Sequence, residues 1–348
     1  NSLSEAGAVY IFKRSNSQWV QQAYIKATNT VNNDRFGSSV ALFDSTLAVG
    51  APGEKSSATG IDGNQGNNSL SEAGAAYIFK RSNSQWAQQA YIKASNTGND
   101  DRFGSSIALY DTTLAVGAPG EDSNATGMDG NQDDNSLSDP GAVYVFTHSN
   151  SQWVQQAYVK ASNTGNDDRF GSSIALYGNT LAVGAPGEDS NATGIDGNQG
   201  NNSLSDAGAA YVFTRSNSQW GQQAYVKASN TDDSDLFGSS IALCDDTLAA
   251  GATGEDSQAT GINGNQGDNS LSDTGAVYAL TRSGKQWSQQ AYVKASNTGN
   301  NDRFGTSVTL CGDTLSVGAT GESSNATGID GDQADNSLND AGAVYAFQ

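Results

Sequence analysis

A repeat of 67 residues runs through the whole chain and constrains its fold more than any other feature. The motif Asn1-Ser2-Leu3-Ser4 recurs at Asn68, Asn135, Asn202 and Asn269, and as Asn-Ser-Leu-Asn at Asn336. Five periods (residues 1–67, 68–134, 135–201, 202–268 and 269–335) and a last segment, 336–348, account for all 348 residues. A fixed period is typical of solenoids, propellers and arrays, so the fold must be understood within one repeat.

Each repeat contains four segments with the pattern of β-strands. Residues 7–12 are short, apolar and rich in β-formers, and residues 18–26 alternate between polar and apolar side chains. Residues 36–43 turn at Asp44-Ser45 into residues 46–52. Four strands joined as hairpins are what one propeller blade requires, and no segment shows the 3.6-residue period of a helical solenoid. The sequence therefore predicts an all-β, five-bladed β-propeller of four-stranded antiparallel blades, as a single domain over 1–348.

Two short motifs make this prediction more specific. Phe36-Gly37 recurs at Phe103, Phe170, Phe237 and Phe304, and Gly50-Ala51-Pro52 recurs at Gly117 and Gly184 and as Gly-Ala-Thr at Gly251 and Gly318. In these motifs the chain resembles the FG-GAP repeats of integrin α-subunit propellers over its full length. The resemblance implies that the Phe-Gly strand is innermost, followed outward by the Gly-Ala-Pro, Val-Tyr and Trp strands. It does not extend to the family's calcium loop, because here the first two strands are joined only by Asp44-Ser45-Thr46.

The count of strands predicts how the ring closes. The Val-Tyr strand occurs six times, the first and last copies being 7–12 and 342–347, whereas the other strands occur five times. We expect the N-terminal and C-terminal strands to share one blade, with 18–26 as its outer strand. The surplus Val-Tyr copy would then be displaced, or would pair with another molecule and support self-association.

Composition excludes several classes of partner. Lys and Arg number 17 against 37 Asp and Glu, a net charge of −20, which repels nucleic acid and anionic membranes and attracts cations. No apolar run is long enough for membrane insertion. Cys244 and Cys311 occupy the place of Phe43 in successive repeats, so we expect free thiols that fill space.

The connection between residues 53 and 73 is the candidate site. It is about 20 residues long without a strand pattern, and loops of that length are generally functional or disordered. Oxygen-bearing side chains recur there at relative positions 1, 3, 7 and 11, as calcium ligands on a Gly-containing loop would. The predicted calcium ligands are Asp62, Asn64, Asn68, Glu72; Asp129, Asn131, Asn135, Asp139; Asp196, Asn198, Asn202, Asp206; Asn263, Asn265, Asn269, Asp273; Asp330, Asp332, Asn336, Asp340.

The alternative is that these residues only form turns and cap backbone groups. A second acidic cluster, Glu54 with Glu121-Asp122, Glu188-Asp189 and Glu255-Asp256, follows the Gly-Ala-Pro strand. We interpret it as a solvated acidic surface. The alternative is that these acids contribute further calcium ligands from the same loop. Asp34-Arg35 and its copies are interpreted as an inter-blade or turn-capping pair.

The aromatic residues and the one histidine are the remaining candidate functional residues. The tryptophans Trp19, Trp86, Trp153, Trp220 and Trp287 suit a wide outer rim and are expected to be buried there, with sugar stacking as the alternative. His148 stands where other repeats have arginine, and we expect a solvated turn residue. With one histidine, no catalytic triad and no His-rich metal site can be built, so the prediction is a protein without enzymatic activity.

The preferred functional hypothesis is an extracellular or cell-surface binding and adhesion propeller, possessing several equivalent sites and stabilised by calcium. Its partner would be a protein or glycan at a surface, bound with avidity. Two alternatives stay open, a structural subunit of a surface layer or filament and a lectin-type carbohydrate-binding propeller.

Overall fold

The structure is a computed structural model that describes residues 3–348, and every regular element in that range is a β-strand. These residues contain no helix long and apolar enough to cross a membrane. The chain divides into two compact units, Asn1–Asn166 and Asp167–Gln348, and each unit holds its own complete sheets.

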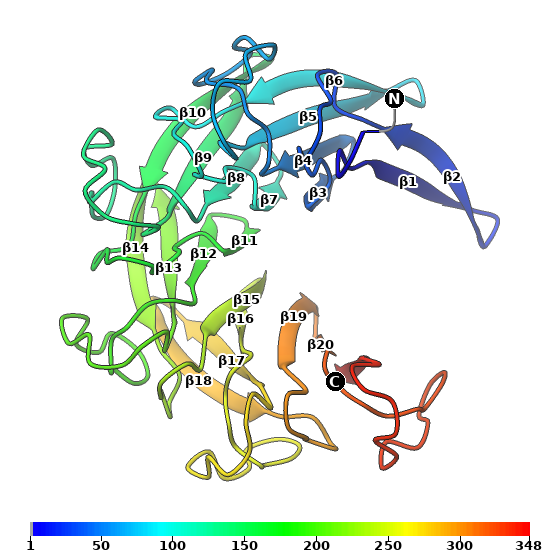
Figure 1. Cartoon of the computed structure of the whole chain (residues 1–348), viewed down its shortest axis with the longest axis vertical. Coiled ribbons are helices and arrows are strands. Elements are labelled where there is room, and N and C mark those ends of the chain that lie inside the picture. The colour runs from blue at the N-terminus through cyan, green and yellow to red at the C-terminus, as the bar shows by residue number, and fades with distance from the viewer. Residues whose placement is uncertain (1–2) are drawn as a thin grey trace. The chain divides into compact units, whose positions relative to one another are not determined.

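The first unit contains one hairpin and two four-stranded antiparallel sheets. Its sheets have the orders β1-β2, β3-β4-β5-β6 and β7-β8-β9-β10, and Figure 1 shows the strands of each sheet side by side. The strands are β1 Val9–Ser15, β2 Gln18–Ile25, β3 Ser39–Phe43, β4 Thr46–Ala51, β5 Ala75–Ser82, β6 Gln85–Ile92, β7 Ser106–Tyr110, β8 Thr113–Ala118, β9 Ala142–Ser149 and β10 Gln152–Val159.

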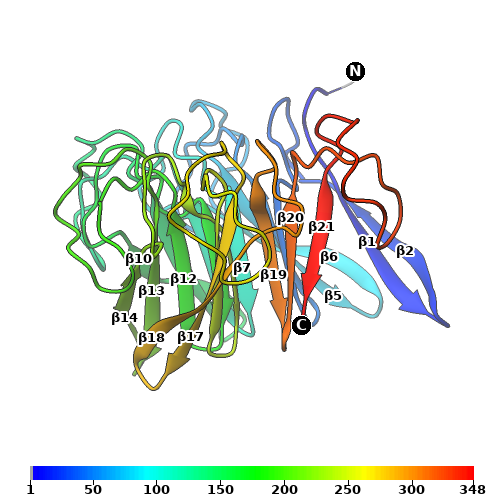
Figure 2. The ribbon, with the colours of Figure 1, turned by 90° about the horizontal axis from the view of Figure 1, so that it is seen from below.

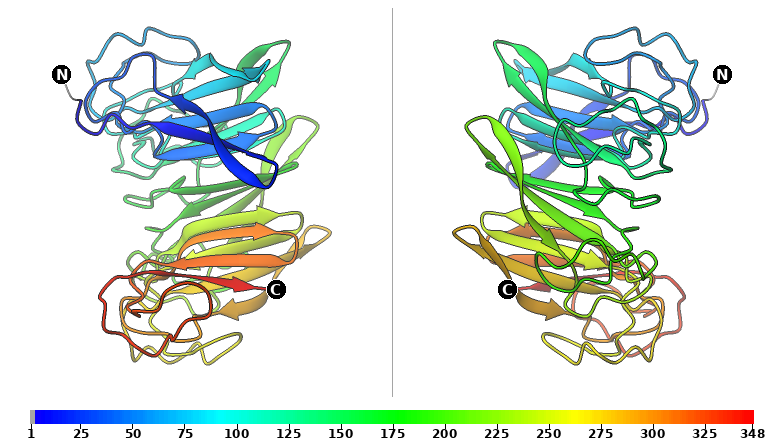
Figure 3. Two further views of the ribbon diagram at one scale, coloured as in Figure 1. Left: turned by 90° about the vertical axis from the view of Figure 1, so that its right-hand side faces the viewer. Right: turned by 90° about the vertical axis from the view of Figure 1, so that its left-hand side faces the viewer.

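The second unit contains two four-stranded sheets and one three-stranded sheet. Their orders are β11-β12-β13-β14, β15-β16-β17-β18 and β19-β20-β21, the last seen in orange and red in the left view of Figure 3. The strands are β11 Ser173–Tyr177, β12 Thr180–Ala185, β13 Ala209–Ser216, β14 Gln219–Val226, β15 Phe237–Cys244, β16 Thr247–Ala252, β17 Ala276–Ser283, β18 Gln286–Val293, β19 Phe304–Cys311, β20 Thr314–Ala319 and β21 Ala343–Phe347.

The predicted blade is confirmed in its strand order. In each four-stranded sheet the strand after Phe-Gly lies at one edge, the Gly-Ala-Pro strand and the Val-Tyr strand follow, and the Trp strand lies at the other edge. The first Val-Tyr copy pairs with β2 and the last pairs with β20. The shared closing blade and the single domain over 1–348 stay predictions.

Close approach of the backbone explains the glycine of the Gly-Ala-Pro strand. A Cβ atom at Gly50 would lie 2.0 Å from the carbonyl oxygen of Gly104, in the turn just before β7 of the next sheet, and 2.2 Å from Ser39 Oγ. Ser39 Oγ donates to the same carbonyl oxygen at 2.7 Å. A side chain at Gly50 would therefore push neighbouring inner strands apart.

Aromatic rings fill the core of each blade. Phe36 packs edge-on against Tyr77, with ring centroids 5.3 Å apart, and against Phe79 at 6.1 Å. All three are buried, and the same trio recurs as Phe103, Tyr144 and Phe146. The Phe of Phe-Gly is thus the ring on which the Val-Tyr strand packs.

Tight turns join the strands at one end of each blade. Asn83 and Ser84, between β5 and β6, both have positive φ (49° and 67°), as a two-residue hairpin turn with the twist of the flanking strands requires. The β3–β4 turn has positive φ at Asp44 (50°). We call this end of the blade the hairpin end.

Candidate functional site

The long connections emerge at the opposite end of each blade, which we call the loop end. Because β4 and β5 are antiparallel neighbours, the connection between them must leave and return at the end away from the two tight turns. Figure 2 shows the long loops of β12–β13 and β16–β17 gathered at that end in the second unit. The candidate calcium residues therefore lie on one end of each blade.

The first two positions of the candidate set are used to fold the loop. Asp62 Oδ1 accepts a hydrogen bond from Tyr91 N at 2.9 Å, which ties the loop to outer strand β6. Asn64 Oδ1 accepts from Gly66 N at 3.0 Å and closes an Asx turn. The same two contacts recur at Asp129 and Asn131, Asp196 and Asn198, and Asn263 and Asn265, and Asp332 repeats the second.

The third position is exposed in all five copies, at Asn68, Asn135, Asn202, Asn269 and Asn336. Among these, Asn269 Nδ2 donates to Asp232 Oδ2 at 2.7 Å. The third position therefore presents amides to solvent at the loop end.

The fourth position lies beside an acidic residue of the second cluster in three copies. The backbone N–H of Asp139 donates to Asp122 Oδ1 at 3.0 Å, and Asp206 and Asp273 do the same to Asp189 and Asp256 at 2.9 and 2.8 Å. Burial raises the pKa of Asp122, and the negative charge of Asp139 raises it further. The structure thus brings two carboxylates together at one point of the loop end.

The first repeat departs from this arrangement. Lys55 stands where the next three copies have an aspartate and the fifth has Ser323. Glu72 is paired with Arg35 Nη2 at 2.9 Å and with Arg102 Nε at 3.4 Å. An ion pair replaces the carboxylate pair, so this copy is not equivalent to the next three.

Calcium binding at the candidate residues stays a prediction. Within residues 3–348 no group of three or more His, Cys, Asp or Glu side chains is placed to hold a metal ion. The turn contacts of the first two positions of the candidate set are the alternative use that the sequence suggested for those residues. The residues that fit a cation best are the paired carboxylates, where a positive charge would relieve repulsion.

The interpretation of the second acidic cluster as a solvated surface is wrong for its glutamates. Glu54, Glu121, Glu188 and Glu255 are at most 1 % exposed, and their counterpart in the fifth repeat, Glu322, is 2 % exposed. Four of them pair with a buried lysine from the end of the outer strand, with Nζ to Oε2 distances of 2.8–2.9 Å: Glu54–Lys93, Glu121–Lys160, Glu188–Lys227 and Glu255–Lys294. The acid that follows the glutamate is half-buried.

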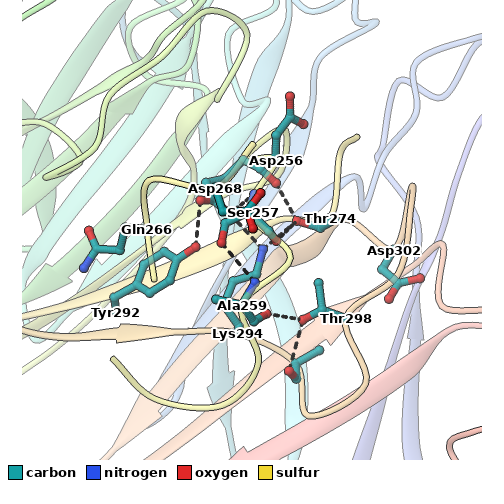
Figure 4. Close-up of polar contacts among 12 residues, drawn as sticks. Asp256, Ser257, Ala259, Gln266, Asp268, Thr274, Tyr292, Lys294, Thr298 and Asp302 are labelled. Atoms are coloured by element: carbon teal, nitrogen blue, oxygen red, sulfur yellow. Dashed lines mark hydrogen bonds and ion pairs between the residues drawn. The ribbon is translucent and has the colours of Figure 1, made fainter. Parts of the chain in front are cut away.

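Further hydrogen bonds satisfy the remaining polar atoms of this buried pair. Around Glu255, Tyr292 Oη donates to Oε1 at 2.7 Å and Asn230 Nδ2 donates to the same oxygen at 3.1 Å. Lys294 Nζ also donates to Thr274 Oγ1 at 2.5 Å, and Figure 4 shows the amine beside Thr274. The ion pair therefore holds the long loop, the outer strand and the preceding connection together.

Burial sets the protonation behaviour of these groups. It lowers the pKa of Lys294 and of Lys93, although the neighbouring glutamate opposes the change. It raises the pKa of Tyr292 well above its usual range, and the charge of Glu255 adds to that effect. The cluster is a charged pair inside a low-dielectric core, with its partners fixed by hydrogen bonds.

The sequence contained a signal for this cluster. In the outer strand Tyr91 and Lys93 are two residues apart, and side chains two apart on a strand point to the same face. Since Tyr91 is a core residue, Lys93 had to point inward and required a buried acid.

A buried aspartate in each copy caps a turn, as the sequence suggested. Asp34 Oδ2 accepts from Val31 N at 2.7 Å, and Asp101 Oδ2 accepts from Gly98 N at 2.6 Å. Burial raises the pKa of Asp34 to about 6 and those of Asp101 and Asp235 to about 7. These aspartates are therefore titratable near neutral pH.

The tryptophans pack at the outer rim as expected in three copies. Trp153, Trp220 and Trp287 are 6–7 % exposed, whereas Trp86 is half-buried and Trp19 is 69 % exposed. Arginine side chains lie over the rings of Trp86, Trp220 and Trp287. The expectation of a solvated turn residue at His148 is wrong, because it lies half-buried in β9 and stacks on Trp153.

The cysteines are free, as expected, with Cys244 half-buried and Cys311 exposed.

The repeated blade, with its Phe-Gly and Gly-Ala-Pro strands, defines the class of FG-GAP propellers. A model of the FG-GAP repeat matches the chain five times, at residues 19–79, 86–146, 153–213, 220–280 and 287–347. The protein therefore belongs to the FG-GAP repeat family and is a five-bladed, all-β propeller of four-stranded antiparallel blades. Comparison with curated proteins gave no match.

Proposed function

We propose that the protein is an extracellular or cell-surface binding and adhesion module that engages its ligand through the loop ends of its blades. One observation carries the proposal: every repeat presents an exposed asparagine at the same place on its long loop. Equivalent weak sites acting together give avidity without any single strong contact. The family membership supports a binding role of this kind, and the proposal assigns no catalytic step.

Calcium is the proposed stabilising ion. The supporting arrangement is the pair of carboxylates formed by the second acidic cluster and the fourth loop position, as in Asp122 and Asp139. Their repulsion in a partly buried place favours a hard cation with oxygen ligands. A protein with a net charge of −20 also attracts cations over its whole surface, so the test must separate local from general binding.

The experiment compares the two ends of the blades. The labelled chain is applied to arrays of glycans and of immobilised extracellular proteins, as are two variants. One variant replaces the loop-end asparagines by serine at 68, 135, 202, 269 and 336. The matched control replaces five exposed amides at the hairpin end by serine at Gln18, Gln85, Gln152, Gln219 and Gln286.

We expect signals on the arrays that the loop-end variant loses and the hairpin-end variant keeps. Binding that survives in the loop-end variant and fails in the control would reject the proposed surface. Signals confined to glycans would favour the lectin-type alternative, for which Trp19 and the half-buried Trp86 are accessible whereas the other three tryptophans are buried.

A second candidate, a self-associating structural subunit, is favoured by the hairpin β1–β2. Tyr10 and Tyr24 on it are each 56 % exposed, whereas their counterparts Tyr77 and Tyr91 are fully buried. Exposed aromatic rings on a hairpin favour association. Sedimentation of the native chain and of a Trp19→Ser variant tests this candidate. The candidate requires that the native chain forms oligomers and that the variant associates more weakly.

A further inference from the structure

In the second unit an arginine and a tryptophan bond to one glutamine of the neighbouring sheet, and His148 stands at the corresponding arginine position in the first unit. In the second unit, Gln223 Oε1 accepts from Trp287 Nε1 at 3.0 Å and from Arg282 Nη1 at 3.3 Å. Arg282 Cζ lies 5.2 Å from the centre of the Trp287 ring. Through its bonds to Arg282 and Trp287, Gln223 Oε1 on β14 thus links its own sheet to the neighbouring sheet.

The corresponding place in the first unit has His148, Trp153 and Gln89. The rings of His148 and Trp153 lie 5.1 Å apart, so the imidazole takes the place of the guanidinium. Gln89 Nε2 lies 3.3 Å from His148 Nε2. Trp153 is 6 % exposed, and its indole N–H has no hydrogen-bond partner within the part of the chain that the structure describes.

With the nitrogen of the Gln89 amide facing His148, the contact belongs to the neutral imidazole that carries its proton on Nδ1. An amide nitrogen only donates, so His148 Nε2 must be the accepting, unprotonated nitrogen of a neutral imidazole. With the amide turned in this way, its oxygen is not bonded to Trp153. When the imidazole gains a proton, Nε2 becomes a donor, and the amide must turn its oxygen toward it.

We propose that protonation of His148 turns the Gln89 side chain so that its oxygen accepts from both His148 and Trp153, as Gln223 does from Arg282 and Trp287. The proton thereby closes a hydrogen bond between the sheets β3–β6 and β7–β10. Histidine is the side chain whose ordinary titration falls between pH 5 and 8, so this contact is sensitive to mild acidity. The proposal does not depend on the ligand.

Other charged groups face this place. His148 lines a small cavity whose charged residues are Asp44, Asp111 and Lys80. Lys80 Nζ is itself bonded to Thr46 Oγ1 at 2.9 Å. Gln89 and Trp153 also line a second cavity, whose one charged residue is Asp62.

NMR spectroscopy of the full chain tests the proposal, because one histidine and five tryptophans give few signals. Solvent exchange of the Trp153 indole N–H is followed from pH 8 to pH 5 relative to that of Trp287, whose hydrogen bond does not depend on a histidine. We expect exchange of the Trp153 N–H, relative to that of Trp287, to slow about fivefold on acidification, as a hydrogen bond of ordinary strength would cause. The midpoint of this change should coincide with the midpoint of the pH-dependent shift of the His148 ring signal.

Two variants and one matched control complete the test. His148→Phe should keep an aromatic ring on Trp153 but remove the pH response, and Gln89→Met should remove the response while the imidazole stack remains. Gln223→Met should expose Trp287 at all pH values equally. The proposal is overturned if Trp153 exchange does not follow His148, or if either His148→Phe or Gln89→Met keeps the pH response.

Discussion

Lys93 Nζ lies 2.9 Å from Glu54 Oε2, and both side chains are closed off from solvent. Within one blade this ion pair links the end of the outer strand to the start of the long loop, and three further copies repeat it. Removing one partner of such a pair leaves an uncompensated buried charge, whereas removing both charges costs much less.

We therefore predict that Lys93→Met lowers the free energy of unfolding by about 3–5 kcal/mol. The double variant Lys93→Met with Glu54→Gln should recover most of that loss. Urea denaturation monitored by tryptophan fluorescence measures both. Lys80→Met, at an exposed position of the same blade, is the control and should change stability by about 0.5 kcal/mol or less. A loss in the double variant as large as in the single one would contradict the account.

A second prediction concerns the glycine of the Gly-Ala-Pro strand. Gly50→Ala places a methyl group 2.0 Å from the Gly104 carbonyl oxygen, so we expect a loss of about 3 kcal/mol or failure to fold. Gly221→Ala is the control, because no atom lies within 4 Å of its added Cβ. That variant should be neutral or slightly more stable in thermal denaturation. Equal effects of the two substitutions would mean that close packing of the inner strands is not what requires glycine.

The buried aspartates predict that stability rises as pH falls from 8 to 6. Asp101 and Asp235 have folded-state pKa values of about 7, above the unfolded value, so the folded state binds more protons in this range. Each should contribute about 1 kcal/mol of added stability at the lower pH. Melting temperatures across this range measure the effect, and Asp101→Asn should flatten the profile. A melting temperature that falls between pH 8 and 6 would contradict this assignment.

Calcium should raise the melting temperature of the native chain after treatment with a chelator, because an ion that binds only the folded state stabilises it by mass action. The variant Asp122→Asn with Asp139→Asn should reduce the calcium response, whereas replacing exposed Asp133 by Asn should leave it intact. A response that is equal in all three proteins would indicate general screening of the acidic surface rather than a local site.

The four strands of a blade could be predicted because the period of 67 residues superimposes five copies of one pattern, and their order was implied by the resemblance of the Phe-Gly and Gly-Ala-Pro motifs to FG-GAP repeats. Pairings between segments far apart in the sequence were less accessible. Glu54 was interpreted as solvated because its neighbours are polar, and only the alternation of Tyr91 and Lys93 pointed to a buried partner. The arginines at the position of His148 in other copies indicate a charged surface side chain, whereas its stack on Trp153 depends on the pairing of β9 with β10.

The central claim, that equivalent loop ends bind a ligand together, is tested most directly by reducing their number. The loop-end asparagines at 68, 135, 202, 269 and 336 are replaced by serine in one, two, three, four and five copies, and dissociation from the array ligand is measured for each variant by surface plasmon resonance. We predict that the dissociation rate rises with every copy altered and reaches a total change of roughly a hundredfold or more, as the loss of avidity requires. A single copy that accounts for the whole change, with the other four silent, would contradict binding through equivalent sites.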